Sequence, residues 1–494
     1  MASQHPDHAG KPYWHNKEFI TAHHEHKECY LTYSDLEIQE YKWDWEGKIV
    51  DESIMERLLG QYYNYFKANP LGKEKFLTFR LPNPKAETEF RLARAFMGIL
   101  SAAALTKQVG LYSPPLFEVI LPMTESADEM IAIKEAFHEI TGLKHKLHRL
   151  EANTLKSLEI IPLFEQVTTI INSDQIIRDY IKMHIAKFKK APGYMRPYVA
   201  RSDPSLNSSL VPTVLAIKIA LSRYKHLARE IGIPLYPIIG SASLPFRGGL
   251  TPFTVDQFIN EYQGIKTALI QSAFRYDYEK ADVIKAIQTL NQKLPTGIAR
   301  DVSSSEEKDI QAIIPFFELP YKKVIEEIAP LINKIAAQLP VRRERVQHIG
   351  LFGYSRGMGK VTLPRAIGFT GALYSIGIPP ELIGTGRGIQ KTIKAGKLKL
   401  LEKFYLNLRY DLTVSGKFLN KKLLNTIAQK YPALAGVQED VKCIEKYLGM
   451  ELGPQTADEK EHLKLTNEIY HGINQSKVSQ DSLKRAAILR KSMG

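Results

Sequence analysis

Residues 158–240 carry the runs LEIIPLF at 158–164, PYVARS at 197–202 and LYPIIG at 235–240, and these three runs decide the fold. Each is rich in apolar, aromatic and β-branched residues, which is typical of a buried strand. Longer stretches with helical periodicity, Asp174–Lys189 and Val211–Gly232, separate them. Strands that alternate with helices at this spacing indicate βα units and a parallel sheet.

The same alternation extends on both sides of this stretch. Further strand-like runs are QEYKWDWE at 39–46, FLTFRL at 76–81, LFEVIL at 116–121, ALIQSAF at 268–274 and IGLFGY at 349–354. The first seven runs start about 33 to 42 residues apart, with helical patterns such as Thr88–Leu105 and Ala127–Thr141 between them. Eight such units predict an α/β fold, a (β/α)8 TIM barrel with additional helices.

The position of the last run predicts three regions. Residues 1–38 form an N-terminal segment with a helix that packs on the barrel, residues 39–386 form the barrel, and residues 387–494 form a C-terminal helical region. The gap before the last run is about twice as long as the others and contains the helical patterns Ala281–Gln292 and Tyr321–Leu339. We therefore expect a helical insertion at about 278–347.

Composition places the chain among globular proteins. Of its 494 residues, 44% are hydrophobic and 24% are charged, which excludes intrinsic disorder as a general description. The two cysteines, Cys29 and Cys443, are too few for a disulfide framework, and the apolar run Ala95–Leu105 is too short to span a membrane. We expect a cytoplasmic protein with no membrane partner.

The chain has an excess of positive charge. Lysine and arginine number 67 against 53 for aspartate and glutamate, which gives a net charge of +14. Such an excess suits nucleic acid, an anionic membrane surface or small anionic substrates. Much of it lies in Lys391–Lys422, whose helical periodicity favours a solvated helix face. The residues at the ends of the predicted strands indicate more about function than the net charge does.

Carboxylates and arginines recur where the predicted strands end. They are Asp44, Glu46, Arg80, Glu118, Glu165, Arg201, Asp203, Arg247 and Arg356. Barrels carry their chemistry at the carboxyl ends of the strands. Carboxylate oxygens are the ligands that Mg²⁺ or Mn²⁺ prefers, and guanidinium groups bind phosphate and carboxylate through paired hydrogen bonds. The ring predicts a divalent cation and a phosphorylated or multiply carboxylated anion at one rim.

Two glycine-rich turns offer phosphate-binding geometry. FGYSRGMGK at 352–360 fails as a Walker A motif because Tyr354 and Val361 stand where glycine and Ser or Thr are needed. Its backbone N–H groups and Arg356 can still face a phosphate. FRGG at 246–249 places Arg247 beside two glycines, which fits either a mobile loop over a bound anion or an ordinary turn.

Seven motifs stand in order along the chain. They are SQHPD at 3–7, YKWDWEGK at 41–48, TFRLPNP at 78–84, IPLFEQV at 161–167, ARSDPSL at 200–206, LPFRGGLTP at 244–252 and GYSRGMGKVTLPRAIGFTGALYSIGIPPELIGTG at 353–386. Together they resemble the small, archaeal-type phosphoenolpyruvate carboxylase family. The resemblance implies an enzyme that forms oxaloacetate and phosphate from phosphoenolpyruvate and bicarbonate, through carboxyphosphate and the enolate of pyruvate. It also implies a homo-oligomer, a tetramer, with no nucleic-acid partner.

The resemblance assigns roles to residues that bind the metal and the substrate. Glu165 in PLFE and Asp203 in RSD match the ligands of the family's divalent cation, Mg²⁺ or Mn²⁺. Arg80 in TFRLP, Arg356 in YSRG and Arg365 in LPRAI match arginines that hold the phosphate and carboxylate of the substrate.

Two further residues match the carboxylation half of the reaction. Arg247 in FRGG matches the loop arginine that guards carboxyphosphate and CO₂, and His5 in QHPD matches the histidine required for carboxylation. The chain departs from the larger bacterial and plant form of the family. Leu206 stands where that form has a lysine, and IGSAS at 239–243 replaces its His-Gly-Arg-Gly-Gly run. We expect Arg201 to supply part of the missing positive charge as a substrate-binding residue.

Two other functions are compatible with the residues. A metal-dependent aldolase or lyase of the phosphoenolpyruvate/pyruvate barrel group would use the same carboxylate pair, without separate phosphate-binding arginines. A basic nucleic-acid-binding protein would use Lys391–Lys422, although the sequence has no RRM, KH or other recognisable module. Dispensable Arg356 and Arg365 would favour the first function, and tight, salt-dependent nucleic-acid binding would favour the second.

Overall fold

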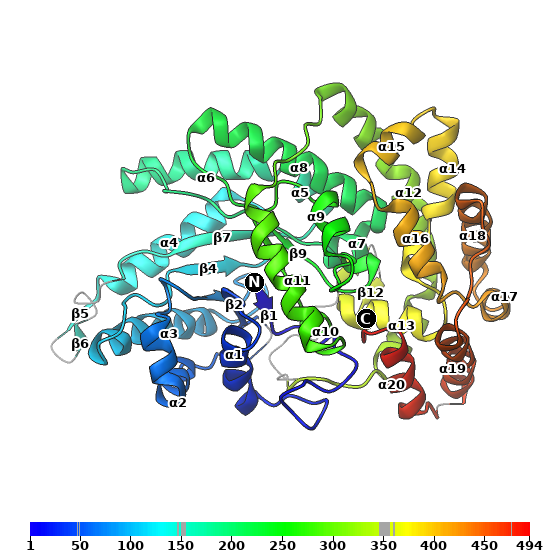
Figure 1. Cartoon of the computed structure of the whole chain (residues 1–494). Helices are drawn as coiled ribbons and strands as arrows, with labels where there is room; N and C mark the ends of the chain where they lie inside the picture. The colour runs from blue at the N-terminus through cyan, green and yellow to red at the C-terminus, as the bar shows by residue number, and fades with distance from the viewer. Residues whose placement is uncertain are drawn as a thin grey trace.

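The core of the protein is a barrel of eight parallel strands (Figure 1). The computed structural model describes residues 1–46, 48, 50–145, 148–149, 155–344, 356–358, 361–475 and 477–494. In barrel order the strands are β1 (Ala2–Ser3), β2 (Glu40–Asp44), β3 (Phe76–Arg80), β4 (Glu118–Leu121), β7 (Glu159–Phe164), β8 (Tyr198–Val199), β9 (Ile238–Gly240) and β10 (Thr267–Leu269). The predicted α/β barrel is confirmed.

The N-terminal strand closes the barrel. β1 pairs in parallel with β2, and Ala2 also bridges to Ile270, directly after β10. The N–H of Ser3 donates to the Ile270 carbonyl at 3.0 Å, and the N–H of Ile270 donates to the Met1 carbonyl at 2.9 Å. We expected residues 349–354 to form the eighth strand, but they lie outside the described residues, and β1 occupies the place between β10 and β2. A strand of two residues carries no periodicity from which it could be predicted.

Helices cover the outside of the barrel. They are α1 (Glu25–Ser34), α2 (Ile54–Ala68), α3 (Glu89–Gln108), α4 (Ala127–Thr141), α5 (Val167–Ile171), α6 (Ser173–Phe188), α7 (Ser202–Ser208), α8 (Leu210–Ile231), α9 (Val255–Glu261), α10 (Ser272–Tyr276) and α11 (Lys280–Lys293). Local sequence sets their ends: Ser126 caps α4 by accepting from the N–H of Glu129, and α8 ends at Gly232, whose φ is 69°. No helix among the described residues has both the length and the apolar character to cross a membrane.

Side chains along the strands alternate between two hydrophobic cores, one inside the barrel and one between the strands and the helices. Inside the barrel a small apolar cluster contains Ile120, Ile161, Leu163, Tyr198, Ala200, Ile238 and Leu269. Tyr41 and Trp43 of β2 belong instead to the larger core between strands and helices. Because side chains alternate along a strand, Glu40, Lys42 and Asp44 face the barrel interior. β2 therefore places charged groups where most barrels have apolar ones.

The rest of the described chain is mostly helical. The long helix α12 (Ser304–Ala336) lies between residues 278 and 347, where the sequence indicated helices, and begins at a capping box of Ser303 and Glu306. It is followed by α13 (Ala366–Ser375), α14 (Thr385–Lys394), α15 (Leu398–Phe404), α16 (Leu408–Gly416), α17 (Lys421–Ala428), α18 (Ala435–Leu448), α19 (Ala457–Asn474) and α20 (Gln480–Leu489). Two hairpins pair β5 (Lys144–His145) with β6 (His148–Arg149) and β11 (Arg356–Met358) with β12 (Val361–Leu363).

Glycines let the C-terminal helices pack backbone to backbone. A Cβ atom at Gly386 of α14 would collide with the carbonyl of Asp440 on α18, and one at Gly388 would collide with the ring of Phe317 on α12. The Asp440 carboxylate also accepts from the N–H of Gly384 and from that of Arg387, both at 2.8 Å. The start of α14 is therefore fixed against its neighbours by contacts that only glycine permits.

The first prediction tests this close packing. We expect Gly386→Ala to lower the melting temperature, because overpacking against backbone costs about 1–3 kcal/mol. Gly60→Ala is the matched control, because it lies in α2 with nothing within 4 Å of the added Cβ atom. The control should leave the melting temperature unchanged or raise it. Equal melting temperatures for the two variants in calorimetry would contradict the packing argument.

Candidate active site

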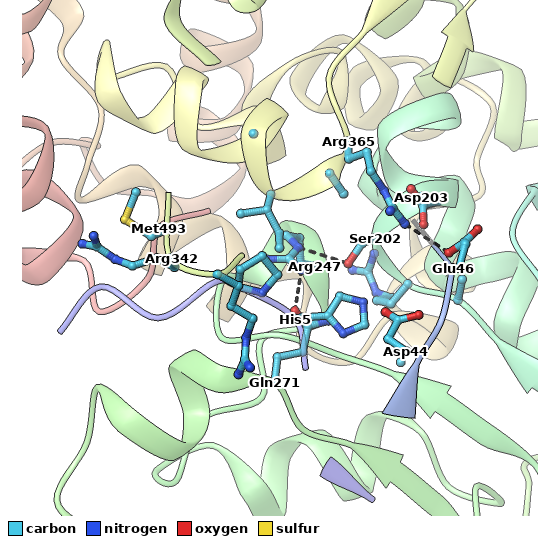
Figure 2. A pocket seen from close by; sticks show the side chains of 18 of the residues that line it. His5, Asp44, Glu46, Ser202, Asp203, Arg247, Gln271, Arg342, Arg365 and Met493 are labelled. Atoms are coloured by element: carbon cyan, nitrogen blue, oxygen red, sulfur yellow. Dashed lines mark hydrogen bonds and ion pairs between the residues drawn. The ribbon is translucent and has the colours of Figure 1, made fainter. Parts of the chain in front are cut away.

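A cavity of about 780 Å³ opens at the carboxyl ends of the barrel strands. Its wall includes His5 after β1, Asp44 in β2, Arg80 in β3, Glu165 after β7, Asp203 after β8 and Gln271 after β10. The end of α12 and the start of α13 cover it from the other side, and Met493 also reaches it. Figure 2 shows His5, Asp44, Asp203 and Gln271 lying together from segments far apart in the chain. The mouth of the barrel is thus the site that the sequence predicted.

The cavity brings together most of the predicted site residues. His5, Arg80, Glu165, Arg201, Asp203, Arg247 and Arg365 all line it. Arg356 lies on β11, but its side chain is outside what the structure describes. Leu206 is fully buried in the core on α7, so the lysine of the large form has no counterpart at this position.

One expected mouth residue lies at the opposite end of the barrel. Glu118 is the first residue of β4, and its carboxylate accepts from Arg196 at 2.5 Å and from the Tyr194 hydroxyl at 2.6 Å. Arg196 also donates to Glu40 at the start of β2. Placing Glu118 at the rim was wrong because the strand runs on from Glu118 rather than ending there, so its carboxylate faces the amino ends of the strands.

Arg80 forms the most extensive ion pair in the cavity. Its Nε and Nη2 atoms donate to the two carboxylate oxygens of Asp44, each at 2.6 Å, and its Nη1 lies 2.5 Å from Oε2 of Glu46. Burial opposes ionisation of Asp44, but the charge of Arg80 outweighs it and holds the pKa of Asp44 well below its usual value. Glu46 also lies 3.3 Å from Arg365, whose side chain is 43% exposed at the rim. Two carboxylates therefore already neutralise Arg80, while Arg365 remains accessible.

Glu165 and Asp203 come from adjacent strands. Glu165 directly follows β7, and Asp203 lies in the first turn of α7, just beyond β8. Burial raises the pKa of Tyr198, and the charges of both carboxylates add to that rise, so the two act on the same point inside the cavity. Among the described residues, no group of three or more His, Cys, Asp or Glu side chains is arranged to hold a metal. Two carboxylates suit Mg²⁺, which usually keeps waters and substrate oxygens as its other ligands.

The Arg247 loop is folded into the cavity. Arg247 ends the short 3₁₀ helix Pro245–Arg247 and is 1% exposed. Its Nη2 donates to Gln271 at 2.6 Å, its Nε donates to the Ser202 hydroxyl at 3.2 Å, and its Nη1 donates to the Gly494 carbonyl (Figure 2). The carboxylate of Asp7 lies 3.6 Å from the same guanidinium.

A glycine fixes the turn that follows this arginine. Gly248 has a φ of 129°, and a Cβ atom there would lie 2.7 Å from the Cβ of Ser241. An L side chain rarely adopts this conformation and would collide with Ser241. The FRGG motif therefore encodes a defined turn that points Arg247 inward.

Arg201 lines the cavity, and its guanidinium holds this loop. Its guanidinium donates to the carbonyls of Pro245 at 3.1 Å and Phe246 at 3.2 Å, to the Tyr262 hydroxyl at 2.9 Å, and to Ser205. These four acceptors occupy a side chain that is only 1% exposed. We therefore interpret Arg201 as a positioning residue for the Arg247 loop.

The surroundings of His5 disfavour the charged form of its imidazole. Burial lowers its pKa well below 6.5, and the positive charges of Lys42 and Arg80 lower it further. Its Nδ1 atom is 2.7 Å from the Ser3 hydroxyl on β1. Lys42 and Gln271 also line the cavity, and neither was predicted from the sequence as a site residue. The alternation of charged and aromatic residues in QEYKWDWE was the signal for Lys42, since it predicts charged side chains inside the barrel.

Arginines and carboxylates gathered at the mouth of an eight-stranded barrel are typical of an enzyme's active site. Comparison with known proteins gives the family. Residues 1–494 match the family model described as phosphoenolpyruvate carboxylase. The chain is 35% identical to the phosphoenolpyruvate carboxylase of Leuconostoc mesenteroides, over 100% of this chain and 98% of that protein. It is 37% identical to that of Metallosphaera sedula, over 100% and 99% of the two chains, and 37% identical to that of Pyrococcus horikoshii, over 86% and 89%. The chain belongs to the phosphoenolpyruvate carboxylase family, in its archaeal type.

The second prediction concerns Arg201. Arg201→Met keeps the length of the side chain but removes the donors that hold the 245–247 backbone. We expect limited trypsin digestion to cut after Arg247 several times faster in this variant than in the wild type, because the buried loop becomes accessible. Arg223→Met is the control, since Arg223 pairs with Asp174 and Glu307 away from the cavity. Equal cleavage at Arg247 in all three proteins, measured by mass spectrometry, would contradict the positioning role.

Proposed function

We propose that this chain converts phosphoenolpyruvate and bicarbonate into oxaloacetate and phosphate in the cavity at the barrel mouth. The observation that carries the proposal is that one cavity contains the carboxylates Glu165 and Asp203 together with Arg80, Arg247 and Arg365. Family membership favours this reaction over that of an aldolase or a lyase, which the residues alone left open.

Substrate binding falls to the arginines at the rim. Arg365 is half exposed and has one described carboxylate beside it, Glu46 at 3.3 Å, so it can bind the phosphate or the carboxylate of phosphoenolpyruvate. Arg80 is held rigidly by Asp44 and Glu46, so its guanidinium keeps a fixed position in the wall. We assign Arg356 to the same task from its family motif.

Glu165 and Asp203 are the residues that would hold Mg²⁺ or Mn²⁺. Their oxygen donors fit a hard cation, and their place on neighbouring strand ends leaves ligand positions for substrate and water. When bound, the cation supplies positive charge to substrate oxygens that gain negative charge during the reaction.

The reaction has two halves, transfer of the phosphoryl group and carboxylation of the enolate. An oxygen of bicarbonate bonds to phosphorus as the bond from phosphorus to the enol oxygen breaks, which gives carboxyphosphate and the enolate of pyruvate. Carboxyphosphate next loses the carboxyl proton and splits into CO₂ and phosphate. That proton passes to the departing phosphate, which is strongly basic, and we assign His5 from its family motif to a hydrogen bond with the carboxyl group. Carbon 3 of the enolate then bonds to CO₂.

Arg247 and the residues around it keep water from the enolate. Its guanidinium is buried, and its loop is fixed by Arg201 and by a hydrogen bond of 2.8 Å from the N–H of Phe246 to Glu381. Water in the cavity would protonate the enolate and yield pyruvate in place of oxaloacetate. We also infer a cytoplasmic enzyme that forms a homotetramer, as the family resemblance implies.

One assay tests the proposed activity. Purified protein is incubated with phosphoenolpyruvate, Mg²⁺ or Mn²⁺, and bicarbonate, and oxaloacetate is followed through malate dehydrogenase and NADH. We expect oxidation of NADH that depends on bicarbonate and on the divalent cation. Phosphoenolpyruvate consumption without any oxaloacetate, or no consumption with either cation, would refute the proposal.

The third prediction tests the metal ligands. Glu165→Gln and Asp203→Asn keep the side-chain shape but remove an anionic oxygen, so each should lower turnover by about a hundredfold or more. The bound fraction of Mn²⁺, measured by electron paramagnetic resonance, should fall in parallel, while the circular dichroism spectrum stays unchanged. Glu135→Gln on the exposed face of α4 is the control. Mn²⁺ binding equal to that of the wild type in both site variants would exclude them as ligands.

A further inference from the structure

Lys42 is a buried lysine with no described partner. Four lysines in the described part of the chain are buried, Lys42, Lys48, Lys134 and Lys218. Three of them have a carboxylate within ion-pair distance: Lys48 with Glu25, Lys134 with Glu159 and Lys218 with Glu261. The Lys42 side chain lines the catalytic cavity, and no described residue forms a hydrogen bond or an ion pair with its amino group.

The neighbouring carboxylates of β2 are already bound to arginines. Asp44, the next inward-facing residue toward the mouth, is bound by Arg80 through two hydrogen bonds of 2.6 Å. Glu40, the next inward-facing residue in the other direction, is bound by Arg196 at 2.7 Å. The positive charge of Lys42 between them is left to the cavity.

The charge of Lys42 acts on the carboxylation side of the site. In the barrel register Lys42 lies opposite Ser3 of β1, two residues before His5. After burial, the charge of Lys42 is the largest influence on the pKa of His5. Burial and the charge of Arg80 lower the pKa of Lys42 to about 7, against the pull of nearby carboxylates. A bound oxyanion would stabilise the ammonium form at this place.

We propose that Lys42 is a further catalytic residue, whose ammonium group binds bicarbonate beside His5 and keeps hold of the carboxyl group of carboxyphosphate until CO₂ forms. The inference rests on the proposed function. A lysine offers a compact point charge, which suits a small anion deep in the barrel, whereas the fork of an arginine suits the phosphate at the rim.

The same contact explains how the carboxyl group is released. Bicarbonate and ionised carboxyphosphate are anions that the ammonium group attracts. When the bond between the carboxyl carbon and the phosphate oxygen breaks, the electron pair leaves with phosphate, and the CO₂ that remains is neutral. The attraction to Lys42 then ends, and CO₂ is free to meet carbon 3 of the enolate.

The test measures the KM of each substrate separately. Lys42→Met keeps the length and removes the charge. We expect its KM for bicarbonate to rise roughly tenfold to a hundredfold, the range for losing one charged hydrogen bond, while its KM for phosphoenolpyruvate changes by less than about twofold. The fraction of phosphoenolpyruvate converted to pyruvate should also rise, as measured by paired lactate and malate dehydrogenase couplings. Lys134→Met removes a buried lysine far from the cavity and should change none of these values.

Two outcomes would overturn the inference. One is a KM for bicarbonate in Lys42→Met equal to that of the wild type. The other is an equal rise in the KM of both substrates, which would show a general loss of positive field. If Lys42→Met does not fold, Lys42→Arg decides by the same comparison, because it keeps the charge but displaces it. A wild type without bicarbonate-dependent oxaloacetate formation would refute the proposed function instead, so the two failures are distinguishable.

Discussion

Burying a charge is costly unless an opposite charge lies beside it, and ion pairs accordingly fix both ends of the barrel interior. At the amino ends of the strands Arg196 binds Glu40 and Glu118, and at the carboxyl ends Arg80 binds Asp44 and Glu46. Both arginines connect β2 to other strands of the sheet. The same pairings fix the wall of the cavity, so substrates meet a preorganised set of charges that needs little rearrangement during the reaction.

The arginines of the mouth differ in what they can do because their partners differ. Arg201 and Arg247 are both almost fully buried, yet Arg201 binds loop carbonyls, while Arg247 meets side chains that line the cavity. Arg365 differs from both, because its side chain is half exposed and lies near the carboxylate of Glu46. A residue at a strand end is thus given its role by the acceptors around it, and those acceptors come from distant parts of the chain.

The sequence predicted the barrel because its longer strands and helices carry clear periodicity. It placed Arg80, Glu165 and Asp203 at one rim because the carboxyl ends of the strands meet there. It missed β1, which is too short to show a pattern. It placed Glu118 at the carboxyl end of a strand, whereas β4 begins at Glu118, and the sequence does not reveal at which residue a strand begins. Lys42 was overlooked although the alternation in QEYKWDWE was visible. That no residue in the described part of the chain pairs with Lys42 can be seen only in the folded barrel.

Closure of the barrel by β1 has a consequence for synthesis on the ribosome. Ser3 and Ile270 are 267 positions apart, and their contact joins the first strand to the last. At roughly 5–20 residues per second, Ile270 is added roughly 13–53 s after Ser3. During that interval β1 has no second neighbour, and its edge away from β2 is open to wrong pairing. The segment that carries His5 therefore takes its working position late, when the barrel closes around it.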